Sequence, residues 1–203
     1  MTLRQRDDGR LRTLLAQECA RIMAEEGVKD FGLAKRKAAE RLGVTNHARM
    51  PGNDEIEQAL LEYQRLFKSS RQPEQLRSLR LIAVQAMRFL QRFRPRLVGS
   101  VLHGSAGAHS DVNLHIFADT PEEVMLFLME QGIPFESSQR RLRYGKGDPV
   151  TRPVLSFSAD GVAIELTVFP PKAEREAPRS PVDGKPMKRA GLAAVEALLR
   201  EPA

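Results

Sequence analysis

Residues 99–116 read GSVLHGSAGAHSDVNLHI and are the most informative part of this 203-residue chain. From Asp111 to Ile116 polar and apolar residues alternate, and this period of two predicts a strand with one face in a core. Apolar pairs on both sides of Gly99-Ser100 predict another strand, interrupted by that dipeptide. We therefore expect two neighbouring strands joined by a turn that is rich in glycine and serine.

The residues that follow predict more strands than helices. We expect a helix over 121–131, two strands joined as a hairpin over 154–158 and 162–168, a Pro-rich loop over 170–186 and a helix over 192–199. Because the strands come in groups with few helices between them, the pattern favours an α+β fold over a doubly wound one.

The residues that precede this stretch are predicted to be helical. Apolar residues recur at helical spacing in four segments, and Pro95 ends the last of them, over 73–93. One arc of this helix is apolar, and the opposite arc carries Arg77, Arg80, Arg88 and Arg92. We expect a helical N-terminal region over 1–94 and a sheet-containing domain over 95–203.

The composition is that of a globular protein, with 41% apolar and 29% charged residues. Cys19 is the only cysteine, and its apolar neighbours predict that it packs in a core of a protein kept in a reducing compartment. No apolar run has the length of a signal peptide or of a membrane span. We expect a cytoplasmic protein with no membrane partner.

Basic residues are concentrated in the first half of the chain. Residues 1–95 contain 19 Lys and Arg against 12 Asp and Glu, whereas residues 96–203 contain 13 against 14. Such an asymmetry of charge is typical of proteins that bind nucleic acid, but a general bias of the composition toward arginine produces it as well. Aromatic residues that could stack on bases are scarce. Nucleic-acid binding through the N-terminal helices is therefore not favoured.

The stretch that begins at Gly99 resembles the signature of the DNA polymerase beta-like nucleotidyltransferase superfamily, especially its minimal members and the aminoglycoside nucleotidyltransferases. That signature is Gly-Ser, a glycine-bearing turn, and then Ser-Asp-hydrophobic-Asp-hydrophobic on the next strand. The matching residues here are Gly99, Ser100, Gly104, Ser110, Asp111, Val112 and Leu114. The resemblance implies that Gly99, Ser100, Gly104 and Ser110 bind ATP or another nucleoside triphosphate.

The resemblance also implies a Mg²⁺ site. Its ligands would be Asp111, residue 113 and a carboxylate from a later strand, for which Glu165 is the candidate, and Asp111 and Glu165 would be catalytic. This chain departs from the signature at Asn113, where the family has its second aspartate. An amide oxygen can ligate a hard cation, but it brings no negative charge.

The chemistry of such a site can be stated without the family. A glycine lets backbone approach a triphosphate, and carboxylates hold Mg²⁺ against phosphate oxygens. Residues two apart on a strand share a face, so we expect one face of the sheet to present Ser100, Asp111, Asn113, His115, Glu165 and Thr167. A separate metal site at His103, His109 and His115 is not favoured, because their spacing matches no standard ligand motif.

Two functions remain open from the sequence. One is Mg²⁺-dependent transfer of a nucleotidyl group from ATP to an unknown acceptor. The other is a catalytically impaired nucleotidyltransferase-like module that binds or regulates, with the helical first half as its interaction surface.

Overall fold

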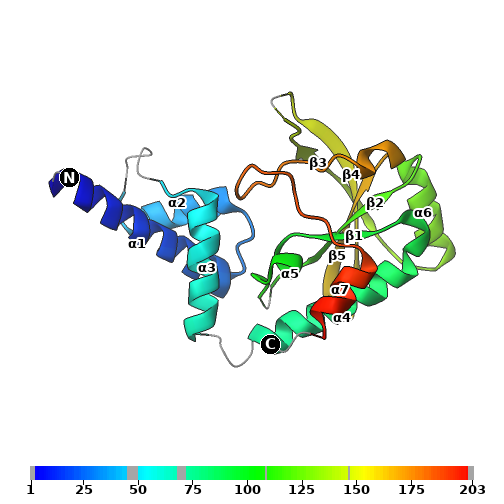
Figure 1. The fold of residues 1–203 in the computed structure, drawn as a ribbon, viewed down its shortest axis with the longest axis horizontal. Coiled ribbons are helices and arrows are strands. Elements are labelled where there is room, and N and C mark those ends of the chain that lie inside the picture. Colours follow the sequence, from blue (N-terminus) through cyan, green and yellow to red (C-terminus); the bar gives the residue numbers. More distant parts are fainter. Residues whose placement is uncertain (1–2, 45–49, 68–71, 108, 146, 201–203) are drawn as a thin grey trace. The chain divides into compact units, whose positions relative to one another are not determined.

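The computed structural model describes residues 3–44, 50–67, 72–107, 109–145 and 147–200 of the chain (Figure 1). It divides into two compact units. Unit 1 comprises Met1–Gln72, Gly107–His109 and Pro181–Asp183, and unit 2 comprises Pro73–Ala106, Ser110–Ser180 and Gly184–Ala203. The elements are helical first and mixed afterwards, so the predicted α+β fold is confirmed.

Unit 1 is built from the helices α1 (Leu3–Glu26), α2 (Phe31–Arg41) and α3 (Asn53–Phe67). Their buried residues form one cluster: Leu15, Ala16, Cys19, Ile22, Ala34, Ala38 and Ile56. Burial raises the pKa of the Cys19 thiol to about 11, so the residue is protonated and packs in the core as predicted.

Several basic side chains of unit 1 are used in ion pairs. Arg12 contacts Glu55 at 2.6 Å, and Lys37 and Arg41 contact Glu26 at 2.7 and 2.6 Å. Exposed pairs of this kind contribute little to stability. They nevertheless show that part of the basic surplus in the first half of the chain is compensated within unit 1.

A mixed five-stranded sheet forms the centre of unit 2 in the described residues, with the order β1-β2-β5-β4-β3 (Figure 1). Its strands are β1 (Arg96–Val98), β2 (Val112–Phe117), β3 (Glu136–Leu142), β4 (Val150–Ala159) and β5 (Val162–Phe169). β2 and β5 run parallel, and the other neighbours run antiparallel. The expected hairpin joins β4 to β5 through Asp160 and Gly161, both with positive φ, as a type I′ turn requires.

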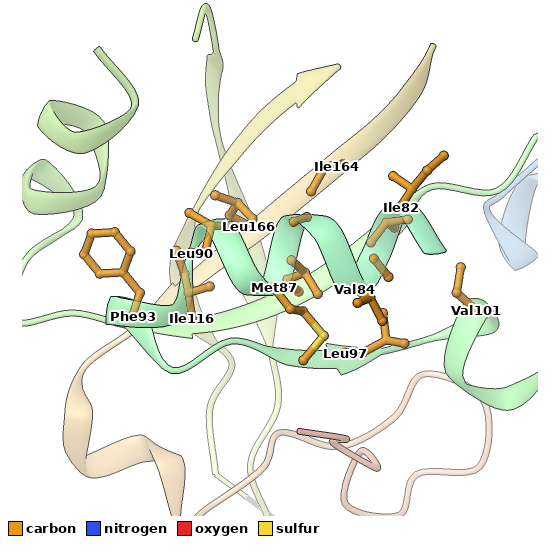
Figure 2. Packing of buried hydrophobic residues seen from close by; sticks show 14 of the residues in the cluster. Ile82, Val84, Met87, Leu90, Phe93, Leu97, Val101, Ile116, Ile164 and Leu166 are labelled. Carbon is orange, nitrogen blue, oxygen red and sulfur yellow. The ribbon is translucent and has the colours of Figure 1, made fainter. Parts of the chain in front are cut away.

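One face of the sheet is covered by helices and forms the core of unit 2. α4 (Gln72–Phe89), the 3₁₀ turn η2 (Gln91–Phe93) and α6 (Pro121–Glu130) supply buried residues to it. Figure 2 shows apolar side chains of α4, of η2 and of Leu90 between them beside those of the strands: Ile82, Val84, Met87, Leu90 and Phe93 with Leu97, Ile116, Ile164 and Leu166.

This packing moves the division of the chain away from the expected one. The predicted boundary is at 94/95, after the long amphipathic helix. The structure instead divides at 72/73, because the apolar arc of α4 is buried in the core that contains the sheet of unit 2. A change from helix to strand along the chain therefore does not mark the boundary between the two units.

The basic arc predicted over 73–93, which lies on α4 and η2, is also used within unit 2. Arg88 pairs with Glu196 of α7 (Leu192–Leu198) at 2.7 Å, and Arg92 lies over the rings of Phe93 and Phe127. Arg80 donates to the Val101 and Leu198 carbonyls. These contacts tie the helix to its own unit, which reduces the charge available to an outside partner.

Charged residues occur in both of the long helices, α1 and α4. Among the residues that the structure describes, no helix combines the length and the apolar character that crossing a bilayer requires. The expectation that the chain has no membrane-spanning helix agrees with this finding.

Candidate functional site

A sharp corner at Gly99 joins β1 to a single helical turn, α5 (Ser100–His103). Gly99 has φ 75° and ψ −156°, a conformation that is essentially restricted to glycine. Gly104 ends the turn with φ 90°, and its N–H donates to the Ser100 carbonyl at 2.8 Å. The prediction that the strand resumes after Gly99-Ser100 is wrong, because residues 100–103 close a helical turn instead.

The sheet brings Asn113 and Glu165 together beside this corner. They are direct partners in the parallel register of β2 and β5, and Asn113 also pairs with Val98 of β1. A Cβ atom built on Gly99 would lie 3.9 Å from the side chain of Asn113. His115 and Thr167 pair one step further along the same face. The four polar residues of β2 and β5 therefore share a face, in agreement with the alternation in the sequence.

Ser110 and Asp111 precede β2 and are half-buried. The Asp111 carbonyl lies 3.4 Å from Nδ2 of Asn113. Asp111 therefore lies just before β2, two residues from Asn113, and the register of β2 with β5 does not include it.

Arg140 was not among the predicted site residues, and the fold brings it to Glu165 and Asn113. From β3, its guanidinium reaches past β4 to Glu165, with 2.6 Å between Nη2 and Oε2. Its Nη1 lies 3.5 Å from Oδ1 of Asn113. No local signal marks this arginine, because only the register of β3 on β4 and of β4 on β5 places it on the same face.

Arg140 decides how well the predicted metal ligands suit Mg²⁺. A hard dication needs oxygen ligands with net negative charge. Here the Glu165 carboxylate is neutralised by a guanidinium, and the neighbouring position holds the neutral amide of Asn113. In the described residues no three His, Cys, Asp or Glu side chains converge as a metal site. This donor set does not fit Mg²⁺ unless Arg140 leaves Glu165, so the expected magnesium site stays a prediction.

His115 is buried on the same face, with 3% of its surface exposed. Arg189 donates from Nε to Nδ1 of His115 at 3.0 Å, and the Phe169 ring packs against the imidazole at 4.5 Å. Burial, then the charges of Arg189 and Arg140, lower its pKa to about 3. The imidazole is therefore neutral at physiological pH and acts as a hydrogen-bond acceptor that orients Arg189.

The three histidines of residues 103–115 have different surroundings. His103 is exposed on α5, His109 belongs to unit 1, where its ring lies next to Gly27, and His115 has Nδ1 occupied by Arg189.

No protein-family model and no curated protein matches this chain.

Proposed function

We propose that unit 2 binds a nucleoside triphosphate at the Gly99-Ser100 corner and acts as a binding or regulatory module. In this proposal Arg140 provides the positive charge that metal ions provide in active nucleotidyltransferases. The observation that carries the proposal is the ion pair between Arg140 and Glu165, with the Arg140 guanidinium also 3.5 Å from Asn113.

The corner supports phosphate binding through its backbone. Gly99 has no side chain, and its conformation turns the chain sharply into α5. Asn113, which lies against Gly99, is also the neighbour of the Arg140 guanidinium. A guanidinium suits phosphate oxygens because it can donate two parallel hydrogen bonds. A triphosphate at this corner would therefore meet an arginine already positioned by Glu165.

A second candidate function is Mg²⁺-dependent nucleotidyl transfer, which the register of Asn113 with Glu165 favours. It requires Arg140 to swing away so that Asp111 and Glu165 can face a metal. The two functions differ in an observable way, since a transferase releases pyrophosphate from ATP and a binding module does not.

Substitution of Arg140 tests the proposal. Arg140→Met is expected to weaken ATP binding in the presence of EDTA by about tenfold, because one charge-assisted contact to phosphate is lost. Isothermal titration calorimetry on the full chain measures the change. The matched control is Arg141→Met, which removes the same charge from an exposed residue whose side chain points to the opposite face of β3.

Unchanged ATP affinity of the Arg140→Met protein in EDTA would contradict the proposal. Release of pyrophosphate by the wild-type protein with Mg²⁺, abolished by Asp111→Ala, would instead establish the transferase.

A further inference from the structure

Three polar atoms of unit 2 are buried without a hydrogen-bond partner in the described part of the chain. They are Nε of Arg152, Nη2 of Arg189 and the hydroxyl of Tyr144. All three can donate a hydrogen bond. Buried donors are almost always paired in folded proteins, so a group of them calls for an acceptor.

The two arginines pack against the same aromatic ring, that of Phe169. The guanidinium carbon of Arg189 is 5.0 Å from the centre of the Phe169 ring, and that of Arg152 is 5.8 Å from it. Val154 of β4 pairs with Thr167 of β5 in an antiparallel register. Arg152 lies two residues before Val154, and Phe169 lies two residues after Thr167, so Arg152 and Phe169 are on the same face and at the same height along the two strands. Both guanidinium groups therefore lie near Phe169, whose side chain belongs to the polar face of the sheet.

The orientation of Arg189 is set by its other nitrogen atoms. Nε donates to His115, and Nη1 donates to the carbonyls of Ala173 and Glu174 at 2.9 and 3.2 Å, at the turn η3 (Pro171–Glu174). These bonds hold the guanidinium in place and leave Nη2 as its unused donor. Burial lowers the pKa of Arg189, and the nearby Tyr144 and Glu174 oppose that shift.

The nearby carboxylates are engaged by other arginines. Glu174 pairs with Arg94 and Arg96 at 2.9 and 2.7 Å, and Glu165 pairs with Arg140 at 2.6 Å. Among the described residues, no ion pair compensates Arg152 or Arg189, and neutral His115 adds no negative charge. Two positive charges and a phenol hydroxyl therefore remain for a ligand.

We infer that Arg152, Arg189 and Tyr144 form an oxyanion site that binds a dianionic phosphate group. Two guanidinium charges are matched by a dianion, whereas a single carboxylate would leave one of them uncompensated. Both arginines are partly exposed as residues, so the group can be approached from solvent. The site uses none of the residues of the Gly99-Ser100 corner, and it does not depend on the proposed nucleotide binding.

The test is a titration of the full chain with inorganic phosphate at constant ionic strength, followed by calorimetry or by the melting temperature. We expect phosphate to bind to and stabilise the wild-type protein, and Arg152→Met to weaken this binding roughly tenfold or more. Tyr144→Phe, which removes one hydroxyl, should weaken it by a smaller factor. Arg141→Met is the control for charge alone and should leave phosphate affinity unchanged.

Two results would overturn the inference. The first is that phosphate stabilises the wild-type protein no more than chloride does at equal ionic strength. That result would mean that the buried donors bind water and not phosphate. The other is an equal loss in Arg152→Met and Arg141→Met. A parallel titration with ATP in EDTA identifies the source of the phosphate, because Arg152→Met lowers ATP affinity only if the group belongs to the nucleotide. If Arg152→Met does not fold, Arg152→Lys replaces it, since lysine keeps the charge but lacks the Nε donor.

Discussion

Leu166→Ala is expected to lower the free energy of unfolding of unit 2 by about 3 kcal/mol, within the range of about 2 to 5 kcal/mol for buried leucines. Leu166 is fully buried in β5, the central strand of the sheet, and packs in the cluster shared with α4 (Figure 2). Its truncation removes apolar contacts and leaves a cavity directly behind Glu165 and Thr167. We therefore also expect the site on the opposite face to lose order.

Native-state hydrogen exchange at the amides of β2 and β5 measures this loss, because it reports on unit 2 separately from unit 1. The control is Leu126→Ala on α6, which makes the same chemical change at a side chain that is 58% exposed. Its effect should stay within about 0.5 kcal/mol. Equal losses in the two variants would mean that the cluster is not the core that supports the sheet.

Acid is expected to destabilise unit 2 through His115. The pKa of His115 falls from its ordinary value of 6.5 to about 3 in the folded chain. Between pH 6.5 and pH 3 the unfolded chain therefore binds a proton at His115 and the folded chain does not. The stability contributed by neutral His115 is lost as the pH falls through 6.5 toward 3. Between about pH 7.5 and about pH 5 this loss amounts to about 2 kcal/mol.

Replacement of His115 by asparagine removes the titrating group and isolates its contribution. We expect the stability of the His115→Asn protein to vary less between these pH values than that of the wild-type protein, by about 2 kcal/mol. Denaturant unfolding at each pH, read by hydrogen exchange in β2, measures the difference. If the stabilities of the wild-type and His115→Asn proteins varied equally with pH, the folded chain would bind a proton at His115 as readily as the unfolded chain does, which would contradict the prediction.

The physical reason for the acid effect also concerns the phosphate site. Protonated His115 could not accept from Nε of Arg189, and it would place a third positive charge beside Arg189 and Arg140. The guanidinium of Arg189 would then lose the bond that orients it. The expected phosphate affinity of the Arg152–Arg189 pair is accordingly highest where His115 is neutral.

Local patterns were enough for the parts of this protein whose conformation depends on neighbouring residues. Alternation predicted β2 and β5, and the Asp160-Gly161 turn predicted the hairpin of β4 and β5. Helical spacing predicted α4, and the capping residues at its two ends predicted α6. The face shared by Asn113, His115, Glu165 and Thr167 followed from the same period of two. These predictions are correct because the direction of side chains along a strand or helix is set by backbone geometry alone.

Other features could not be read from any local window. β3 was not located because its residues Glu136–Leu142 are polar and mostly exposed on both faces, so they show no alternation. Residues 100–103 have the composition of a strand, yet the backbone of Gly99 turns them into a helical turn. α4 was assigned to the wrong side of the division between the units because an amphipathic arc does not reveal which surface buries it.

The tertiary structure alone decided the chemistry of the polar face. Arg140 and Glu165 are 25 residues apart, and Arg189 and His115 are 74 residues apart. Their contacts depend on the order and register of strands and on the path of the chain after β5, which arise from long-range packing. The amino-acid pattern therefore determined which residues share a face of the sheet. Only the assembled sheet determined that this face is dominated by arginines, because charge balance at a site depends on distance in space and not on position along the chain.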